Sequence, residues 1–210
     1  MTISLRRSGD LAPGGNYYVQ PADRVEGQGG AVDSAVGARR EQILVAAVQL
    51  FRSRGYDRTS LREIAASLGL SKSGLYHHFP SKDDLLAAAV DPLLDRLGDL
   101  VDSSPPARSA ADRNRFLAAY LDILIQHRDV VGLIGADAAV RAHPRIGARL
   151  AELDESLYRR LSGDGADLAR QVRAAYALVG LQDTVGRFSD ADPAVVRSAG
   201  LAAAAAAVAG

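Results

Sequence analysis

The spacing of apolar residues predicts a chain built from helices. From Arg39 onward, apolar positions recur every three or four residues, as Ile43, Ala47 and Phe51 do, which places them on one helical face. Turn-forming residues separate the periodic stretches, and the alternation typical of strands is absent. The sequence therefore predicts an all-α protein with a first helix from Arg39 to a capping Gly55, then helices over residues 61–68, 72–78, 82–100 with a kink near Pro92, 111–127, 129–141, 144–162, 167–188 and 193–208.

Capping residues delimit two short consecutive helices. Ser60 and Glu63 have the spacing of a capping box, in which each side chain bonds to a free backbone amide of the same turn. Gly69 ends the first helix where a left-handed residue is needed, and Ser71 caps the second. After Pro80, Ser81 starts a longer helix. Two short helices joined by a tight turn are typical of a helix-turn-helix.

The two short helices have an apolar side and a polar side. Leu75 and Phe79 of the second helix are expected to pack on the first helix and on the helix before it. The other side is short, polar or basic. Gly74 costs about 1 kcal/mol against alanine inside a helix, and close approach to a DNA backbone is the reason we expect for it, since packing alone supplies none. The polar side consists of Lys72, Ser73, Gly74, Tyr76, His77 and His78.

Charge is distributed unevenly along a chain whose formal net charge is zero. Residues 38–82 hold eight basic residues against three acidic ones, which favours a phosphate-binding surface. Residues 1–36 are rich in Gly, Pro and polar residues and are expected to form a disordered arm. A basic arm that reaches a DNA groove is the alternative, but interspersed acidic residues favour a plain tail.

Several classes of function are not supported. The chain has no cysteine, which excludes thiol catalysis and thiolate metal sites. Adjacent His77 and His78 point about 100 degrees apart on a helix, so we expect no metal site. No phosphate-binding loop, HExxH spacing or nucleophile motif occurs, so we expect no catalytic residue and no cofactor. Without a long apolar run or a secretory signal, a cytoplasmic protein with no membrane contact is expected.

The ordered string from Thr59 to Lys82 closely resembles the DNA-binding domain of the TetR family of transcriptional regulators. The resemblance implies that Ser71, Lys72, Ser73 and Gly74 present the tip of a recognition helix to double-stranded operator DNA. It also implies phosphate contacts by Tyr76, His77 and Lys82, and backbone contacts by Thr59 and Ser60. Taken alone, Tyr76 fits a half-buried surface tyrosine equally well, and Lys82 fits a solvated charge. The combination of these residues with the predicted turn favours a DNA-binding surface.

The resemblance also implies a division of the chain. Residues 37–97 would form the helix-turn-helix domain, and residues 98–210 a helical domain for ligand binding and homodimerisation. Each ligand candidate is equally compatible with a core position, and a merely Ala-rich tail is the alternative for the last helix. The ligand candidates are Phe116, Tyr120, Leu124, His127, Ile134, Arg141, His143 and Tyr158, and the dimer candidates are Val172, Ala175, Tyr176, Val179, Gly180, Leu201 and Ala204.

These expectations describe a repressor that a small-molecule effector releases from its operator. The helix that starts after Ser81 joins the two halves, so we expect a ligand to move it and to change the separation of two recognition helices. A DNA-binding activator or architectural factor without an inducer is the first alternative. A helical enzyme is the more remote one.

Overall fold

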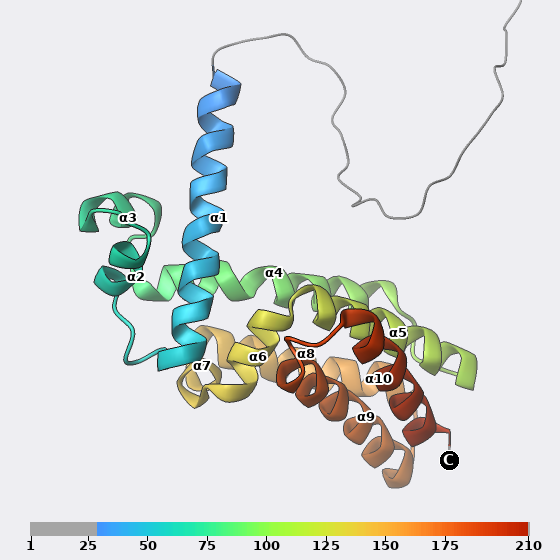
Figure 1. Cartoon of the computed structure of the whole chain (residues 1–210). Helices are drawn as coiled ribbons and strands as arrows, with labels where there is room; N and C mark the ends of the chain where they lie inside the picture. Colours follow the sequence, from blue (N-terminus) through green and yellow to red (C-terminus); the bar gives the residue numbers. More distant parts are fainter. Residues whose placement is uncertain (1–28, 210) are drawn as a thin grey trace, which may run out of the picture.

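A computed structural model describes residues 29–209, which form helices without any strand among them (Figure 1). The prediction of an all-α protein is confirmed. The helices are α1 (Gly29–Arg54), α2 (Leu61–Ser67), α3 (Lys72–His78), α4 (Lys82–Ser103), α5 (Ala110–Gln126), α6 (Arg128–Ala136), α7 (Ala138–Ala142), α8 (Pro144–Ser162), α9 (Leu168–Arg187) and α10 (Pro193–Val208).

The predicted caps start and end the short helices. The Ser60 side chain accepts from the Glu63 amide and the Glu63 side chain accepts from the Ser60 amide, which completes the capping box of α2. The Ser71 and Ser81 side chains cap α3 and α4 by accepting from the amides of Gly74 and Asp84. Gly55 and Gly69 follow α1 and α2 with φ of +89° and +64°, a region that L side chains rarely adopt. Local chemistry therefore fixes these boundaries.

Two boundaries differ from the prediction. α1 begins at Gly29, so residues 29–36 are helical, whereas the expected disordered arm covered residues 1–36; its residues 1–28 lie outside the described part. The single helix predicted over residues 129–141 is wrong, because Asp137 interrupts it in an extended conformation between α6 and α7. The Asp137 side chain accepts from the amide of Ala139 and, over a long sequence separation, from the amide of Tyr56. A tertiary contact thus stabilises the break.

The helices form a small unit beside α1 and a larger bundle (Figure 1). α2 and α3 lie next to α1 near the start of α4, while the N-terminal half of α1 projects away from the other helices. α4 continues through Pro92 into the bundle, where it packs on α5 and α8. α10 packs on α9 and α5, and α6 packs on both α1 and α9. No described helix is long and apolar enough to cross a membrane.

Candidate functional site

The paired short helices are held by a small apolar core. Ile64 of α2 and Leu75 of α3 are fully buried, as are Ile43 and Phe51 of α1, and Phe79 is 2% exposed. These residues sit at the positions that the apolar pattern predicted. Burial of one side chain of this size stabilises the folded protein by about 1.5–3 kcal/mol, so this core fixes the orientation of α3 on α1 and α2.

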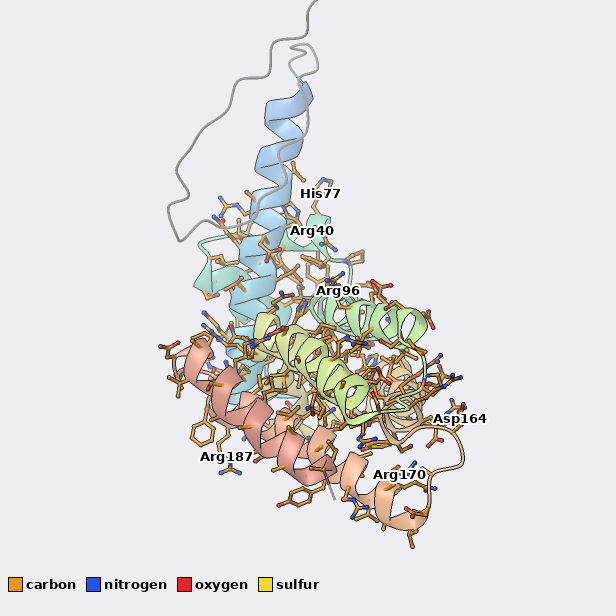
Figure 2. All side chains as sticks on the ribbon, turned by 90° about the vertical axis from the view of Figure 1, so that its right-hand side faces the viewer. Arg40, His77, Arg96, Asp164, Arg170 and Arg187 are labelled. Atoms are coloured by element: carbon orange, nitrogen blue, oxygen red, sulfur yellow. The ribbon has the colours of Figure 1, made fainter. Side chains whose placement is uncertain are left out.

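The opposite side of α3 is open to solvent. Ser71, Lys72, Ser73, Tyr76 and His77 are all exposed, and the exposed fraction of Tyr76 is 40%. Lys72 Nζ lies 5.3 Å from the centre of the Tyr76 ring, so a cation and a phenol occupy the same surface. Figure 2 shows His77 far from Asp164 and Arg170, which lie at the opposite end of the molecule. This surface presents hydrogen-bond donors and positive charge together.

Gly74 lies at the position whose amide meets the cap of α3. Its amide donates to Ser71 Oγ over 3.1 Å, and a Cβ at position 74 would lie 3.2 Å from the same oxygen. The Ser71 hydroxyl belongs to a side chain that can rotate, and Glu63 and Asp84 occupy the same position under the caps of α2 and α4. Close approach to DNA therefore stays the reason that we expect for glycine at position 74.

Thr59 does not belong to the exposed set. Its exposed fraction is 2%, and its hydroxyl donates to the carbonyl of Gly55 over 2.8 Å. Its amide donates to the carbonyl of Tyr56. With both donors engaged inside the protein, the expected DNA contact of Thr59 is a wrong prediction. Ser60 is exposed, although its amide and hydroxyl both bond to Glu63 Oε2.

Lys82 is partly buried at the start of α4. Its Nζ donates to the carbonyls of Tyr56 and Asp57 over 3.0 and 3.5 Å and lies 4.2 Å from the centre of the Tyr56 ring. A lysine ammonium has three protons, so one donor remains for an outside acceptor. Lys82 therefore ties α4 to the end of α1 whether or not it also meets a phosphate.

The basic residues of this region are not all available to a partner. Arg54 pairs with Glu63 at 3.1 Å, and the Arg40 guanidinium stacks 4.8 Å from the centre of the Phe79 ring. Among the described residues, Arg62 and Lys72 form no ion pair, and both are exposed. Free positive charge thus lies on α2 and on the tip of α3, and also at the exposed Arg39 and Arg58, which form no ion pair within residues 29–209.

A polar junction joins the small unit to the bundle. The Tyr56 hydroxyl donates to Asp83, and His143 Nε2 lies 3.8 Å from the other carboxylate oxygen. The Tyr56 hydrogen bond holds the pKa of Asp83 below its ordinary value, and burial raises the pKa of Tyr56. Nearby, Arg52 of α1 bonds to Asp129 of α6. The expected ligand contact His143 therefore belongs to this junction.

A cavity of about 720 Å³ lies among α4, α6, α8 and α9. Three ligand candidates, Leu124, Ile134 and Arg141, line it. Phe116 and Tyr120 are core residues that do not line it, and the partly buried His127 has a pKa lowered first by burial and then by the charge of Arg96. Tyr158 borders a separate hollow.

Several cavity residues were not among the candidates. They include Leu93, Leu97, Leu150, Asp154 and Gln182. The leucines have the same spacing as core residues, and a single acidic residue on a helix resembles an ordinary solvated one. No signal within the sequence separates a cavity wall from a packed core, because only the facing helices determine which gap stays open.

Most dimer candidates on α9 lie at the surface. The exposed fractions of Val172, Tyr176 and Val179 are 57%, 76% and 50%, and Gly180 is also exposed. Ala175 and Leu201 are partly buried. Ala204 is 4% exposed, so its assignment to an interface is wrong. It belongs with Val196, Gly200 and Val208 on the inner face of α10.

Comparisons with known proteins agree with this architecture. Residues 43–89, which include α2 and α3, match the family described as bacterial regulatory proteins, tetR family. The HTH-type transcriptional repressor KstR2 of Mycobacterium tuberculosis is 36% identical over 113 residues, which are 52% of this chain and 52% of that protein. The chain therefore matches about half the length of this curated relative. The nucleoid occlusion factor SlmA of Pasteurella multocida is 27% identical over 158 residues, 69% of this chain and 79% of that protein.

Solved structures share the fold across both parts of the chain. A TetR-family transcriptional regulator from Streptomyces coelicolor is 26% identical with a TM-score of 0.64, and the match covers 79% of this chain and 88% of that one. The KstR2 structure from Mycobacterium tuberculosis gives the same TM-score of 0.64 at 22% identity, covering 81% and 93%. The bundle, which has no motif of its own, is thus similar in arrangement to that of known regulators.

Proposed function

The chain belongs to the TetR family of bacterial regulatory proteins, and from this premise we propose that it is a DNA-binding repressor that a small-molecule ligand releases from its operator. The observation that carries the proposal is the exposed face of α3, with Lys72, Ser73, Tyr76 and His77, on a helix pair with a buried core. Such a helix presents side chains to the major groove, while neighbouring phosphates bind cations and hydroxyl donors. The relative KstR2 is named as a transcriptional repressor, and SlmA as a nucleoid occlusion factor.

A homodimer is part of the proposal. One α3 contacts only one half-site, and a two-fold pair of such helices reads two half-sites on the same face of the duplex. The exposed apolar side chains of α9 are available to a second copy. Pairing of α9 and α10 across a two-fold axis would bury them.

The coupling between ligand and DNA is proposed to run through α4 and α6. Leu93 and Leu97 of α4 line the cavity, and the same helix begins at Ser81 beside α3. Val131 and Gly132 of α6 line it as well, and the Arg52 guanidinium lies close to Gly132. A ligand that shifts either helix therefore acts on contacts of the DNA-binding unit. By linkage, operator DNA must weaken ligand binding by the same factor.

A DNA-binding factor without an inducer is the second candidate. The similarity to a nucleoid occlusion factor supports it, because the name of that protein refers to no small-molecule effector. The two candidates differ in one measurement. Ligand affinity that is equal with and without operator would contradict release by a ligand, while DNA binding itself would remain.

The first test is DNA binding by fluorescence anisotropy. The full chain is titrated onto labelled DNA from upstream of its own coding sequence and onto a scrambled fragment of equal length. We expect selective binding that weakens as salt rises, because phosphate contacts release counterions. The double variant Lys72→Ala, Tyr76→Ala should lose about tenfold or more in affinity, since each lost contact costs about 1–3 kcal/mol.

A matched control keeps this test specific. Arg115→Ala removes an exposed positive charge on α5, where Arg115 pairs only with Asp112 at 3.4 Å. It should leave DNA affinity unchanged. Equal weakening by both variants, or binding that ignores the DNA sequence, would contradict a sequence-reading role for α3.

A further inference from the structure

The cavity walls are mainly apolar, with a small number of charged groups. Leucine, isoleucine and valine side chains from α4, α5, α6, α8 and α9, together with glycines and alanines, form most of the lining. A volume of about 720 Å³ falls within the range of about 300–1,000 Å³ that small-molecule sites occupy. The charged residues in the lining are Arg141, Asp154, Asp183 and Arg187.

Three of these four charged residues already have partners. Arg187 Nε lies 3.3 Å from Asp183 Oδ2, and the side chains are 67% and 64% exposed. Arg141 donates to the carbonyls of Ile134 and Gly135, at the end of α6. Arg141 is itself exposed. Water screens charges of this kind, so these residues contribute little net charge to the interior.

Asp154 differs from the other three. It is partly buried on α8, and among residues 29–209 no Lys, Arg or His forms an ion pair with it. Burial raises the pKa of Asp154, and the neighbouring Gln182 amide offsets part of that rise. A desolvated carboxylate without a counter-ion is unfavourable, and a cation brought to it gains more than it would in water.

The Gln182 amide and two phenols surround Asp154, and no cation does so among residues 29–209. The Tyr120 hydroxyl is buried and, among the described residues, has no hydrogen-bond partner. The charge of Asp154 contributes to the raised pKa of both Tyr120 and Tyr158, after burial, so both phenols lie within its field. Asp154 is thus the group of this cluster that lines the cavity, and its negative charge meets no cation among the described residues.

We propose that this cavity takes an apolar ligand that carries a protonated amine, with Asp154 as the counter-ion of the ammonium group. The inference rests on the proposed function in taking the cavity as the effector site. The hydrocarbon part of such a ligand contacts Leu93, Leu97 and Leu150, and its ammonium group donates to Asp154. A carboxylate ligand is disfavoured, because it would be desolvated beside a negative charge while the arginines stay engaged at the exposed rim.

The test uses three probes with one carbon skeleton. Decylamine, decanol and decanoate are titrated separately onto the full chain at pH 7 by isothermal calorimetry, where the amine is protonated and the acid ionised. We expect decylamine to bind about tenfold or more tightly than decanol, since a hydrogen bond to a charged group is worth about 1.5–3 kcal/mol. Decanoate should bind most weakly.

Two variants locate the effect. Asp154→Asn keeps the shape and removes the charge, so decylamine should lose its advantage over decanol. Asp183→Asn, at the same cavity but paired with Arg187, should keep that advantage. Tighter binding of decanoate, no binding of decylamine, or an amine preference that survives Asp154→Asn overturns the inference. The comparison of probes on the unmodified chain holds even where Asp154→Asn lowers stability.

A measurement with DNA distinguishes this inference from the proposed function. Each probe is added to the protein–DNA complex in the anisotropy measurement. Decylamine that binds through Asp154 without releasing DNA would sustain the inference and contradict the ligand-released repressor. Release by decanoate alone would sustain the repressor and overturn the inference.

Discussion

Tyr56 connects the DNA-binding unit to the bundle through several groups at once. Its hydroxyl donates to Asp83 of α4, its ring lies under the Lys82 ammonium, and its amide donates to Asp137 between α6 and α7. His143 packs edge-on against the same ring. Because these partners come from distant parts of the chain, a substitution of Tyr56 affects the whole junction.

Tyr56→Phe is expected to remove one of these contacts while keeping the ring. Loss of the hydrogen bond should lower the free energy of unfolding by about 1 kcal/mol at pH 7, a modest value because the Asp83 carboxylate is largely exposed. The measurement is thermal unfolding by circular dichroism. Tyr76→Phe, on the exposed side of α3, is the control and should leave the unfolding temperature unchanged.

The same pair predicts a pH dependence. The pKa of Asp83 is lowered in the folded protein, so the stability it contributes is present above the unfolded pKa of about 4 and is lost as pH falls through the folded pKa. The stability difference between the native chain and Tyr56→Phe should therefore shrink below about pH 4. A difference that stays constant down to pH 2 would contradict the assigned hydrogen bond.

At the scale of elements, the junction of α7 and α8 is unusually tight. The amide of Gly147 donates to the carbonyl of His143 over 2.7 Å, and a Cβ at position 147 would lie 2.5 Å from the carbonyl oxygen of Arg141. That oxygen is backbone and cannot move aside without shifting α7. The close approach of α7 to α8 therefore requires glycine at position 147, although glycine is a poor helix former.

Gly147→Ala should destabilise the protein by about 1–3 kcal/mol, because the added methyl group forces α7 away from α8. Gly98→Ala in α4 is the matched control, since a Cβ there meets nothing within 4 Å. It should raise stability by up to about 1 kcal/mol through helix propensity. Both effects are measured by urea unfolding. An unchanged free energy of unfolding in Gly147→Ala would show that α7 moves away from α8 at little cost.

At the scale of the whole molecule, several large apolar side chains of α9 and α10 are uncovered. Leu168, Val172 and Tyr176 of α9 are 75%, 57% and 76% exposed, and Val195 of α10 is 63% exposed. The inner faces of both helices are buried in the bundle. Exposed apolar side chains on two neighbouring helices favour an interaction surface, which is why a second copy of the chain is the proposed partner.

The double variant Val172→Asp, Tyr176→Asp should shift the protein from dimer to monomer in sedimentation velocity, because each subunit would bury two charges. DNA affinity should fall with it, since a monomer engages one half-site. Ala148→Asp, on the exposed surface of α8, is the control and should change neither. A variant that stays dimeric would place the interface elsewhere on the molecule.

The sequence by itself determined the features that depend on near neighbours. The caps at Ser60, Ser71 and Ser81 bond to amides three residues away, so their spacing alone predicted where α2, α3 and α4 begin. The apolar period likewise predicted the buried side of α3, at Leu75. The domain boundaries at residues 36 and 97 remain predictions.

Tertiary structure decided what depends on groups far apart in the sequence. Whether Thr59 is buried, whether Lys82 is occupied by Tyr56 and whether Ala204 faces inward all depend on which helix lies opposite. The break at Asp137 depends on the Tyr56 amide, which donates to the Asp137 side chain. Asp154 is a charge without a counter-ion only because none of the helices packed around it, within residues 29–209, places a cation there. Burial and pairing are properties of facing surfaces, and a local pattern specifies only one of the two surfaces that meet.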